Sequence, residues 1–294
     1  MYLKIRTDLT ERCREEHERT VRFLREQLGE HRPLQRVTPL DARRFLAWYR
    51  KRSVKDSPVA PSTVNKVLRE CRRIFREAVD CQFIKSNPFA GIRPSKVADT
   101  PWHHVTPKEF HALLNATKST RWQGMIMLGY CCGLRIGEIL NLTWDDVDFK
   151  ANTIRIVAKS GEATEDWTPK DKDMRVVPLP APATVPLAKL RLAARAETPY
   201  VFTLDKGPNA NKRMRRQNTW RDFDVIRRRA GLPPCCMHDL RRSYCTNLSR
   251  SMPMHVVQEL AGHSDIRTTR RYYVKVQPEL FDEARRVVEK AVAS

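Results

Sequence analysis

The sequence lacks the features by which several classes of protein are recognised. No segment approaches the about 18 uninterrupted apolar residues of a membrane-spanning helix, and the first residues, Met-Tyr-Leu-Lys-Ile-Arg, lack the hydrophobic centre of a signal peptide. Glycine is scarce, at 10 of 294 residues, and no phosphate-binding P-loop is present. We therefore predict a cytoplasmic protein that associates with no membrane and uses no ATP.

Metal-binding and disulfide motifs are missing as well. The eight cysteines include two adjacent pairs, Cys131-Cys132 and Cys235-Cys236, but no Cys-x-x-Cys of the kind that zinc ribbons use. No cluster of carboxylates suited to Mg²⁺ occurs either. The sequence predicts no metal and no cofactor, and it predicts reduced, mostly buried cysteines.

Acidic residues are in deficit. The chain has 55 lysines and arginines against 34 aspartates and glutamates, which gives a formal net charge of +21. Much of the excess lies in residues 201–250, which hold 12 basic and 4 acidic side chains. Since 41% of the residues are hydrophobic, the chain has enough apolar side chains to fold. A folded and strongly basic protein indicates a polyanion as its partner.

Apolar residues recur at helical spacing in three segments of the first third. These segments are 9–28, 38–48 and 62–78. The periodicity stops between residues 87 and 104, where three prolines and a glycine form a stiff, basic connection. We place a domain boundary there and predict a helical domain over residues 1–98 and a second domain over residues 99–294.

The second domain combines helices with one hairpin. Helices are predicted from a capping box at Thr106 and over the apolar run 125–132, which Gly133 ends. Residues 153–158 alternate as a strand, and residues 175–179 are the returning partner across a long polar loop. The fold class is therefore mainly α, with a small antiparallel β-sheet in a mixed α+β second domain.

Side chains that can do chemistry gather in five motifs of the second domain. They are Arg135-Ile136-Gly137-Glu138, the hairpin lysines Lys159, Lys170 and Lys172, His238-Asp239-Leu240-Arg241, Gly262-His263, and Thr269-Arg270-Arg271-Tyr272-Tyr273. Each has an ordinary explanation when taken alone, because most Arg/Glu pairs one turn apart and most loop lysines are solvated surface charges. The combination, in this order, is specific.

The combination resembles the tyrosine recombinase, or phage integrase, family over the whole second domain, and the first domain looks like the family's helical core-binding (SAM-like) domain. By this resemblance the catalytic residues are Arg135, Lys170, His238, Arg241, His263 and Tyr272, with Glu138 as the acidic neighbour of the first arginine. One departure is Ala261, where the family commonly has leucine. It removes no catalytic group.

More than one residue of the sequence fits the role of the catalytic lysine, and the same holds for the catalytic tyrosine. Relatives keep the lysine close to the returning strand, which favours Lys170 over Lys159 and Lys172. Adjacent positions on a helix diverge by about 100°, so only one of Tyr272 and Tyr273 can face a phosphate. The nine-residue spacing from the histidine of the Gly-His motif favours Tyr272.

These residue types suit the cleavage of a DNA phosphodiester. Two arginines and a histidine can donate to the phosphoryl oxygens of the transition state. A tyrosine with an ordinary pKa of about 10 needs a base or nearby positive charge before it can attack, and His238 is a candidate. The lysine would protonate the departing 5′ oxygen. A 3′-phosphotyrosine keeps the energy of the phosphodiester, so neither ATP nor a metal is needed.

The resemblance implies a site-specific recombinase or integrase of a mobile element that acts on double-stranded DNA, near the nucleoid, as a homo-tetramer on paired sites. Residues after 275 form an amphipathic pattern with Pro278 at its start, which predicts a tail helix that docks on a neighbouring protomer. The alternatives are a type IB topoisomerase and a catalytically idle DNA-binding regulator. Complete sets of catalytic residue types are not expected in an idle relative.

The charge balance predicts how DNA binding depends on salt. With six to ten phosphate contacts, affinity for duplex DNA should fall by about 10³- to 10⁵-fold between 50 and 200 mM salt. Fluorescence anisotropy with a labelled duplex at a series of salt concentrations measures this slope. A flat response would mean that the basic stretch from Lys212 to Arg229 is solvated surface that does not meet the DNA backbone.

Overall fold

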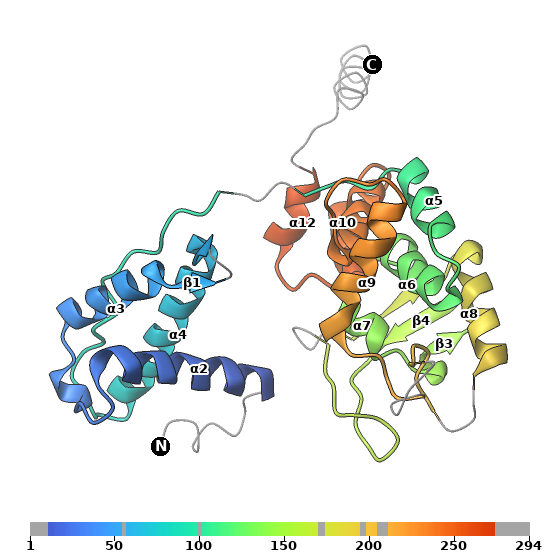
Figure 1. Cartoon of the computed structure of the whole chain (residues 1–294). Coiled ribbons are helices and arrows are strands. Elements are labelled where there is room, and N and C mark those ends of the chain that lie inside the picture. The colour runs from blue at the N-terminus through green and yellow to red at the C-terminus, as the bar shows by residue number, and fades with distance from the viewer. Residues whose placement is uncertain are drawn as a thin grey trace, which may run out of the picture. The chain divides into compact units, whose positions relative to one another are not determined.

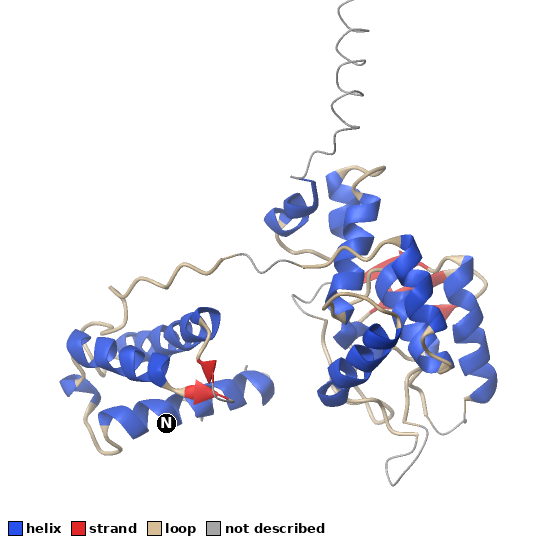
Figure 2. Ribbon diagram, turned by 45° about the horizontal axis from the view of Figure 1, so that its top comes forward, coloured by secondary structure: helices blue, strands red, loops and turns tan. Residues whose placement is uncertain are grey.

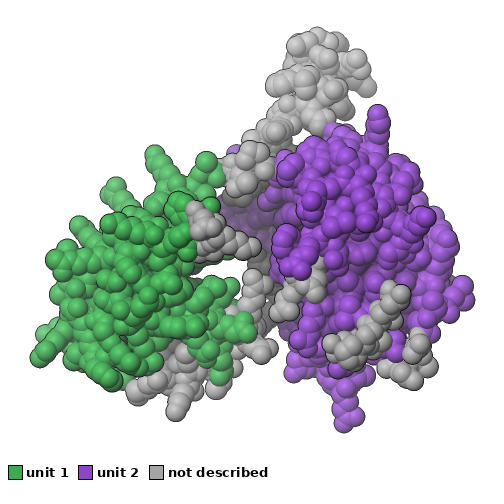
Figure 3. All heavy atoms as spheres, viewed as in Figure 1, with its two compact units in different colours: residues 1–100 green, residues 101–294 purple. Residues whose placement is uncertain are grey.

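The structure is a computed structural model that describes residues 11–54, 57–98, 102–169, 174–194, 198–204 and 211–273. It divides into two compact units, Met1–Thr100 and Pro101–Ser294 (Figure 3). Within the described ranges, every helix is too short or too polar to cross a membrane.

Unit 1 is helical (Figure 1). Its elements are α2 (Glu11–Leu28), the 3₁₀ turn η1 (Leu34–Arg36), α3 (Pro39–Lys51), the short hairpin β1 (Ser53–Val54) and β2 (Ser57–Pro58), and α4 (Pro61–Asp80). The start of α3 is the predicted one: the Asp41 amide donates to the Thr38 hydroxyl, and the Thr38 amide donates back to the Asp41 carboxylate. Apolar faces of the three helices meet in a core that contains Phe45 and Phe75. The three helices predicted from periodicity are confirmed.

Unit 2 carries helices around a small sheet. The helices are α5 (Pro107–Asn115), α6 (Thr120–Cys131), α7 (Ile136–Leu140), α8 (Ala181–Ala193), α9 (Arg216–Arg229), α10 (Met237–Leu248), α11 (Met254–Ala261) and α12 (Ile266–Tyr273). The sheet has the order β3-β4-β5 and is antiparallel, with β3 (Val147–Asp148), β4 (Thr153–Ile156) and β5 (Arg175–Pro178) (Figure 2).

The predicted hairpin is confirmed, with Ile156 opposite Arg175 and Thr153 opposite Pro178. The first strand ends at Ile156, two residues before the predicted end. Strand β3 was not predicted, because a strand of two residues is too short to show alternation.

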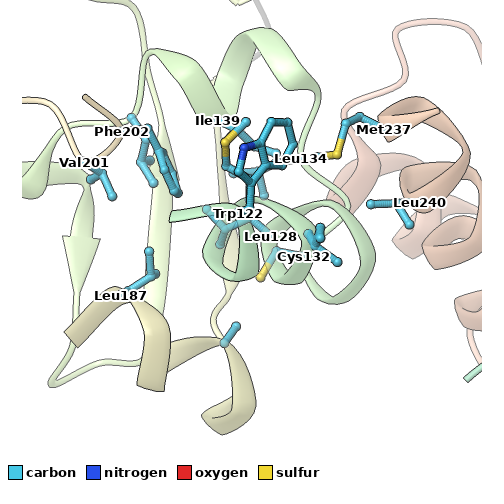
Figure 4. Packing of buried hydrophobic residues seen from close by; sticks show 14 of the residues in the cluster. Trp122, Leu128, Cys132, Leu134, Ile139, Leu187, Val201, Phe202, Met237 and Leu240 are labelled. Atoms are coloured by element: carbon cyan, nitrogen blue, oxygen red, sulfur yellow. The ribbon is translucent and has the colours of Figure 1, made fainter. Parts of the chain in front are cut away.

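The core of unit 2 is built around α6 (Figure 4). Helix α6 packs against both α8 and α10. Gly129 permits the close approach of α10, since a Cβ at this position would lie 3.3 Å from two carbon atoms of Leu240. The core therefore fixes the position of α10, the helix that contains His238 and Arg241.

The eight cysteines are free thiols, as predicted, but the expectation that most are buried is wrong. Cys71, Cys132 and Cys245 are buried, whereas Cys81 and Cys236 are exposed. The exposed two occupy capping positions, at the end of α4 and the start of α10, where the backbone turns at the surface.

Candidate active site

A single buried carboxylate, that of Glu138, lies among three arginines. It accepts hydrogen bonds from Arg135 Nη1 at 2.8 Å and from both terminal nitrogens of Arg175 at 3.1 and 2.8 Å. The third guanidinium, Arg241, approaches to 3.9 Å. Burial would raise the pKa of Glu138, but the hydrogen bonds and charge of Arg175, followed by the charges of Arg241 and Arg135, lower it. The carboxylate is ionised, and the cluster of three arginines and one glutamate carries a net charge of 3 − 1 = +2.

The turn between α6 and α7 places Arg135 at this carboxylate. Gly133 has a φ of 65°, in the left-handed region, and a Cβ there would overlap the ring of Tyr244. Arg135 is the N-cap of α7, and its backbone amide donates to Glu138 Oε2 at 2.8 Å. The sequence spacing of three residues thus lets one carboxylate hold both the backbone and the side chain of Arg135.

The same three arginines bind the end of α11. Arg175 Nε donates to the carbonyl of Leu260 at 3.0 Å, Arg241 Nη2 donates to the carbonyl of Ala261, and Arg135 Nη2 donates to the carbonyl of Gly262. The last carbonyls of a helix have no partner within the helix, and they form the negative end of its dipole. Gly262 then turns the chain with a φ of 62°. The next residue, His263, is therefore held beside the arginine cluster.

The two predicted histidines both have lowered pKa values. Burial, followed by the charges of Arg241 and Arg135, lowers the pKa of His263 to about 3. His238 is exposed at the surface of α10, yet partial burial of its ring and the charges of Arg242 and Arg241 lower its pKa to about 4. Near neutral pH both rings are neutral, while Arg241, with a pKa lowered to about 10, stays charged. A neutral histidine can act as a base or as a hydrogen-bond donor.

The structure brings together four of the predicted site residues: Arg135, Glu138, Arg241 and His263. His238 lies one turn before Arg241 on the same helix, and Tyr272 lies on α12, with its side chain outside the described part. Lys170 and Lys172 are also outside the described residues.

Arg175 belongs to this cluster although none of the five sequence motifs contains it. In the sequence it stands out only as the residue that opens the returning strand. Burial of a charged side chain at the start of a strand would have been the signal, but burial follows from the approach of α11, which the local sequence does not show.

Lys159, a rival for the catalytic lysine, has a different partner. Its Nζ lies 2.5 and 2.6 Å from the two carboxylate oxygens of Asp146, which is buried. Asp146 Oδ2 also accepts from the amide and the hydroxyl of Thr143, at 2.9 and 2.8 Å. Lys159 is thus the cation of a nearly buried ion pair that attaches the start of the hairpin loop to η2 (Trp144–Asp146).

The described part of the chain contains no group of three or more histidine, cysteine, aspartate or glutamate side chains that could hold a metal ion. The excess of positive charge at Arg135, Arg175 and Arg241 suits an anion instead. A tetrahedral anion with several acceptor oxygens matches forked guanidinium donors.

Comparison with a family model and with known proteins identifies one family. The model of the phage integrase family matches residues 103–279. A tyrosine recombinase XerA from Thermococcus kodakarensis is 30% identical over 254 residues, which cover 85% of this chain and 80% of that protein. A tyrosine recombinase XerC-like protein from Caldanaerobacter subterraneus subsp. tengcongensis is 28% identical over 249 residues. That match covers 74% of this chain and 63% of the relative, so the chain spans less than two thirds of the relative's length.

Solved structures share the fold. The integrase of transposon Tn1549, in complex with transposon right end DNA, has a TM-score of 0.77 at 20% identity and covers 99% of this chain and 97% of that one. A lambda integrase dimer bound to a core site has a TM-score of 0.69 at 17% identity and covers 92% of each chain.

The lowered pKa of His263 predicts a pH dependence of stability. The folded ring stays neutral down to about pH 3, whereas in the unfolded chain it takes up a proton near the ordinary histidine pKa of 6.5. Between these limits the unfolded state binds a proton that the folded state does not, so the free energy of unfolding should fall as the pH falls below 6.5. Urea unfolding at pH 7, 6 and 5 measures the slope.

His263→Gln should make this loss smaller, because glutamine binds no proton in this range. The control is His31→Gln, the same substitution at an exposed position of unit 1. Equal slopes in the wild type and in His263→Gln would mean that the folded ring titrates normally.

Proposed function

The chain belongs to the phage integrase family, and we propose that it is a site-specific recombinase that cleaves and rejoins DNA strands through a 3′-phosphotyrosine intermediate. The observation that carries this proposal is the buried cluster of Arg135, Arg175 and Arg241 around Glu138, which has an uncompensated positive charge next to His263. DNA supplies the missing anion as the phosphate to be cleaved.

Each group has a defined part in the reaction. The hydroxyl oxygen of Tyr272 attacks the phosphorus, the bond from phosphorus to the 5′ oxygen breaks, and the proton of the tyrosine passes to His238. Arg135 and Arg241 stabilise the charge that develops on the non-bridging oxygens. Lys170 gives the leaving 5′ oxygen a proton. In the reverse direction a 5′ hydroxyl from another strand attacks the phosphotyrosine and completes strand exchange.

The electrostatics of the site support these roles. His238 accepts a proton only if its ring is neutral beforehand, and its lowered pKa keeps it so. Positive charge near the phosphate also favours the tyrosinate form of the nucleophile.

The engagement of Lys159 supports Lys170 as the general acid. The ammonium of Lys159 is bound by both oxygens of a buried carboxylate, and withdrawing it would leave Asp146 buried without its counter-ion. Lys170 lies five residues before Arg175, whose side chain is part of the arginine cluster, so the chain returns to the site shortly after it.

We assign DNA clamping to the two units together, with unit 1 as the core-binding domain and unit 2 as the catalytic domain. Recombination joins two sites and needs four active sites, so a homo-tetramer on DNA is the working assembly. A lambda integrase tetramer bound to a Holliday junction is among the similar structures, with a TM-score of 0.69. Exchange of flanking sequence between two DNA molecules separates a recombinase from a topoisomerase, which only relaxes supercoils.

Tyr272→Phe should abolish covalent attachment to DNA while binding stays within a few fold, because only the nucleophilic oxygen is removed. The substrate is a duplex selected by binding from a random pool and nicked near its centre, so that cleavage traps the adduct. Denaturing gels of labelled DNA measure the adduct, in excess EDTA because the mechanism uses no metal.

Tyr273→Phe is the matched control and should form adduct at the rate of the wild type. An adduct that persists in Tyr272→Phe and disappears in Tyr273→Phe would reverse the assignment. No adduct from the wild type on any selected duplex would contradict the proposed function.

Lys170→Ala should cleave ordinary DNA slowly and recover most of its rate on a 5′-phosphorothiolate substrate. A 5′-bridging sulfur leaves readily as a thiolate and needs no general acid. Single-turnover cleavage of the two substrates gives the ratio of rates.

Lys159→Ala is the control for position and should lower the stability of unit 2, by about 3 kcal/mol or more, because it leaves Asp146 buried and unpaired. Its cleavage defect should be equal on both substrates. Rescue by sulfur in Lys159→Ala, with normal cleavage by Lys170→Ala, would transfer the role to Lys159.

A further inference from the structure

Thr269 is buried on a helix that is otherwise exposed at this end. Its side chain has no exposure to solvent, whereas Ile266, Arg267, Thr268 and Arg270 are all exposed. A buried hydroxyl in a short surface helix needs a hydrogen-bond partner inside the protein. Its contacts therefore determine how α12 is seated on the rest of unit 2.

The partner of Thr269 is His263. The hydroxyl oxygen of Thr269 lies 2.9 Å from Nδ1 of the His263 ring, across the turn that joins α11 to α12. The contact fixes the ring by one nitrogen, and the branched side chain of threonine has few alternative rotamers with which to release it. Gln258 holds the His263 backbone, since its carbonyl accepts from the His263 amide at 3.1 Å and its side chain donates to the His263 carbonyl at 2.9 Å, and Thr269 orients the ring.

The proton of this hydrogen bond can be on either atom. A hydroxyl donates or accepts, and a neutral imidazole has one nitrogen of each kind. If Nδ1 donates, Nε2 carries a lone pair. If the hydroxyl donates to Nδ1, the proton of the ring is on Nε2. The two tautomers have opposite chemistry at Nε2.

The surroundings decide between the tautomers. Burial, followed by the charges of Arg241 and Arg135, lowers the pKa of His263 and keeps its ring neutral, so it carries a single proton. The oxygens of a phosphate only accept hydrogen bonds, and a ring that turned a lone pair toward them would repel them. A neutral His263 can therefore assist at the phosphate only from the tautomer with its proton on Nε2.

We propose that Thr269 is a positioning residue that donates its hydroxyl proton to Nδ1 of His263 and so holds the ring in the tautomer that donates from Nε2 to the phosphate. The choice of tautomer follows from what a phosphate can accept, so the proposal rests on the proposed function, although the tautomer itself can be measured without DNA. Because Thr269 is three residues before Tyr272, the helix that carries the nucleophile also determines the orientation of the His263 ring. Packing of α12 onto unit 2 therefore positions both the His263 ring and the segment that carries Tyr272.

Nitrogen NMR tests the tautomer without any DNA. In the full chain labelled with ¹⁵N-histidine, the two ring nitrogens of His263 are assigned by their loss in His263→Gln. The wild type and Thr269→Ser should show the proton on Nε2. Thr269→Val, which replaces the hydroxyl by a methyl group of similar size, should show a mixture or the proton on Nδ1. A proton on Nδ1 in the wild type overturns the proposal.

Cleavage kinetics test the consequence. Thr269→Val should slow single-turnover cleavage by about 10-fold or more, which is less than the about 10²- to 10³-fold cost of losing a transition-state donor itself. DNA affinity should be unchanged, and Thr269→Ser should restore the rate to within a few fold. The matched control is Thr268→Val, the same substitution at the exposed neighbour, which should cleave like the wild type. A Thr269→Ser variant as slow as Thr269→Val would exclude the hydroxyl as the cause.

A double-mutant comparison separates positioning from general support of the fold. If Thr269 acts through His263, Thr269→Val should add little to the defect of His263→Ala. Full additivity of the two defects overturns the proposal, as does a normal rate for Thr269→Val. Lack of cleavage by the wild type contradicts only the proposed function, since the NMR result still decides the tautomer.

Discussion

The structure of unit 2 depends on the ion pairs of the buried Glu138 carboxylate. Guanidinium groups are costly to bury without a counter-ion, and this one carboxylate serves Arg135, Arg175 and Arg241. The last carbonyls of α11, which the same three side chains bind, offset part of the remaining positive charge. One ion cluster thereby joins α7, β5, α10 and α11, which are separated in sequence by more than a hundred residues at the extremes.

This arrangement explains how the site can be both stable and ready for an anion. Carbonyl groups carry only partial negative charge, so the cluster keeps its net positive charge and attracts a phosphate. A second carboxylate in the cluster would make the empty protein more stable, but it would compete with DNA. Burial is the main reason why the pKa values of His238 and His263 are lowered, and the charge of Arg241 adds to it at both rings.

Two lysines of one hairpin, Lys159 and Lys170, have different roles. One holds the loop to the body of unit 2 through a buried carboxylate. We assign proton transfer to the other, Lys170. A similar division holds on α12, where Thr269 is buried and Thr268 is exposed although the two side chains are identical.

The sequence by itself determined the helices of unit 1, the hairpin, and the order of the candidate catalytic groups. These depend on local patterns: the capping box at Thr106, apolar spacing, and the three-residue interval between Arg135 and Glu138. Only the tertiary structure decided that Arg175 shares the carboxylate of Glu138, that Lys159 is paired with Asp146, and that Thr269 holds the ring of His263. The pairs that include Arg175 and Lys159 are 37 and 13 residues apart and meet across different elements. Their contacts depend on how α6, α10 and α11 pack in three dimensions, and no local pattern in the chain encodes that packing.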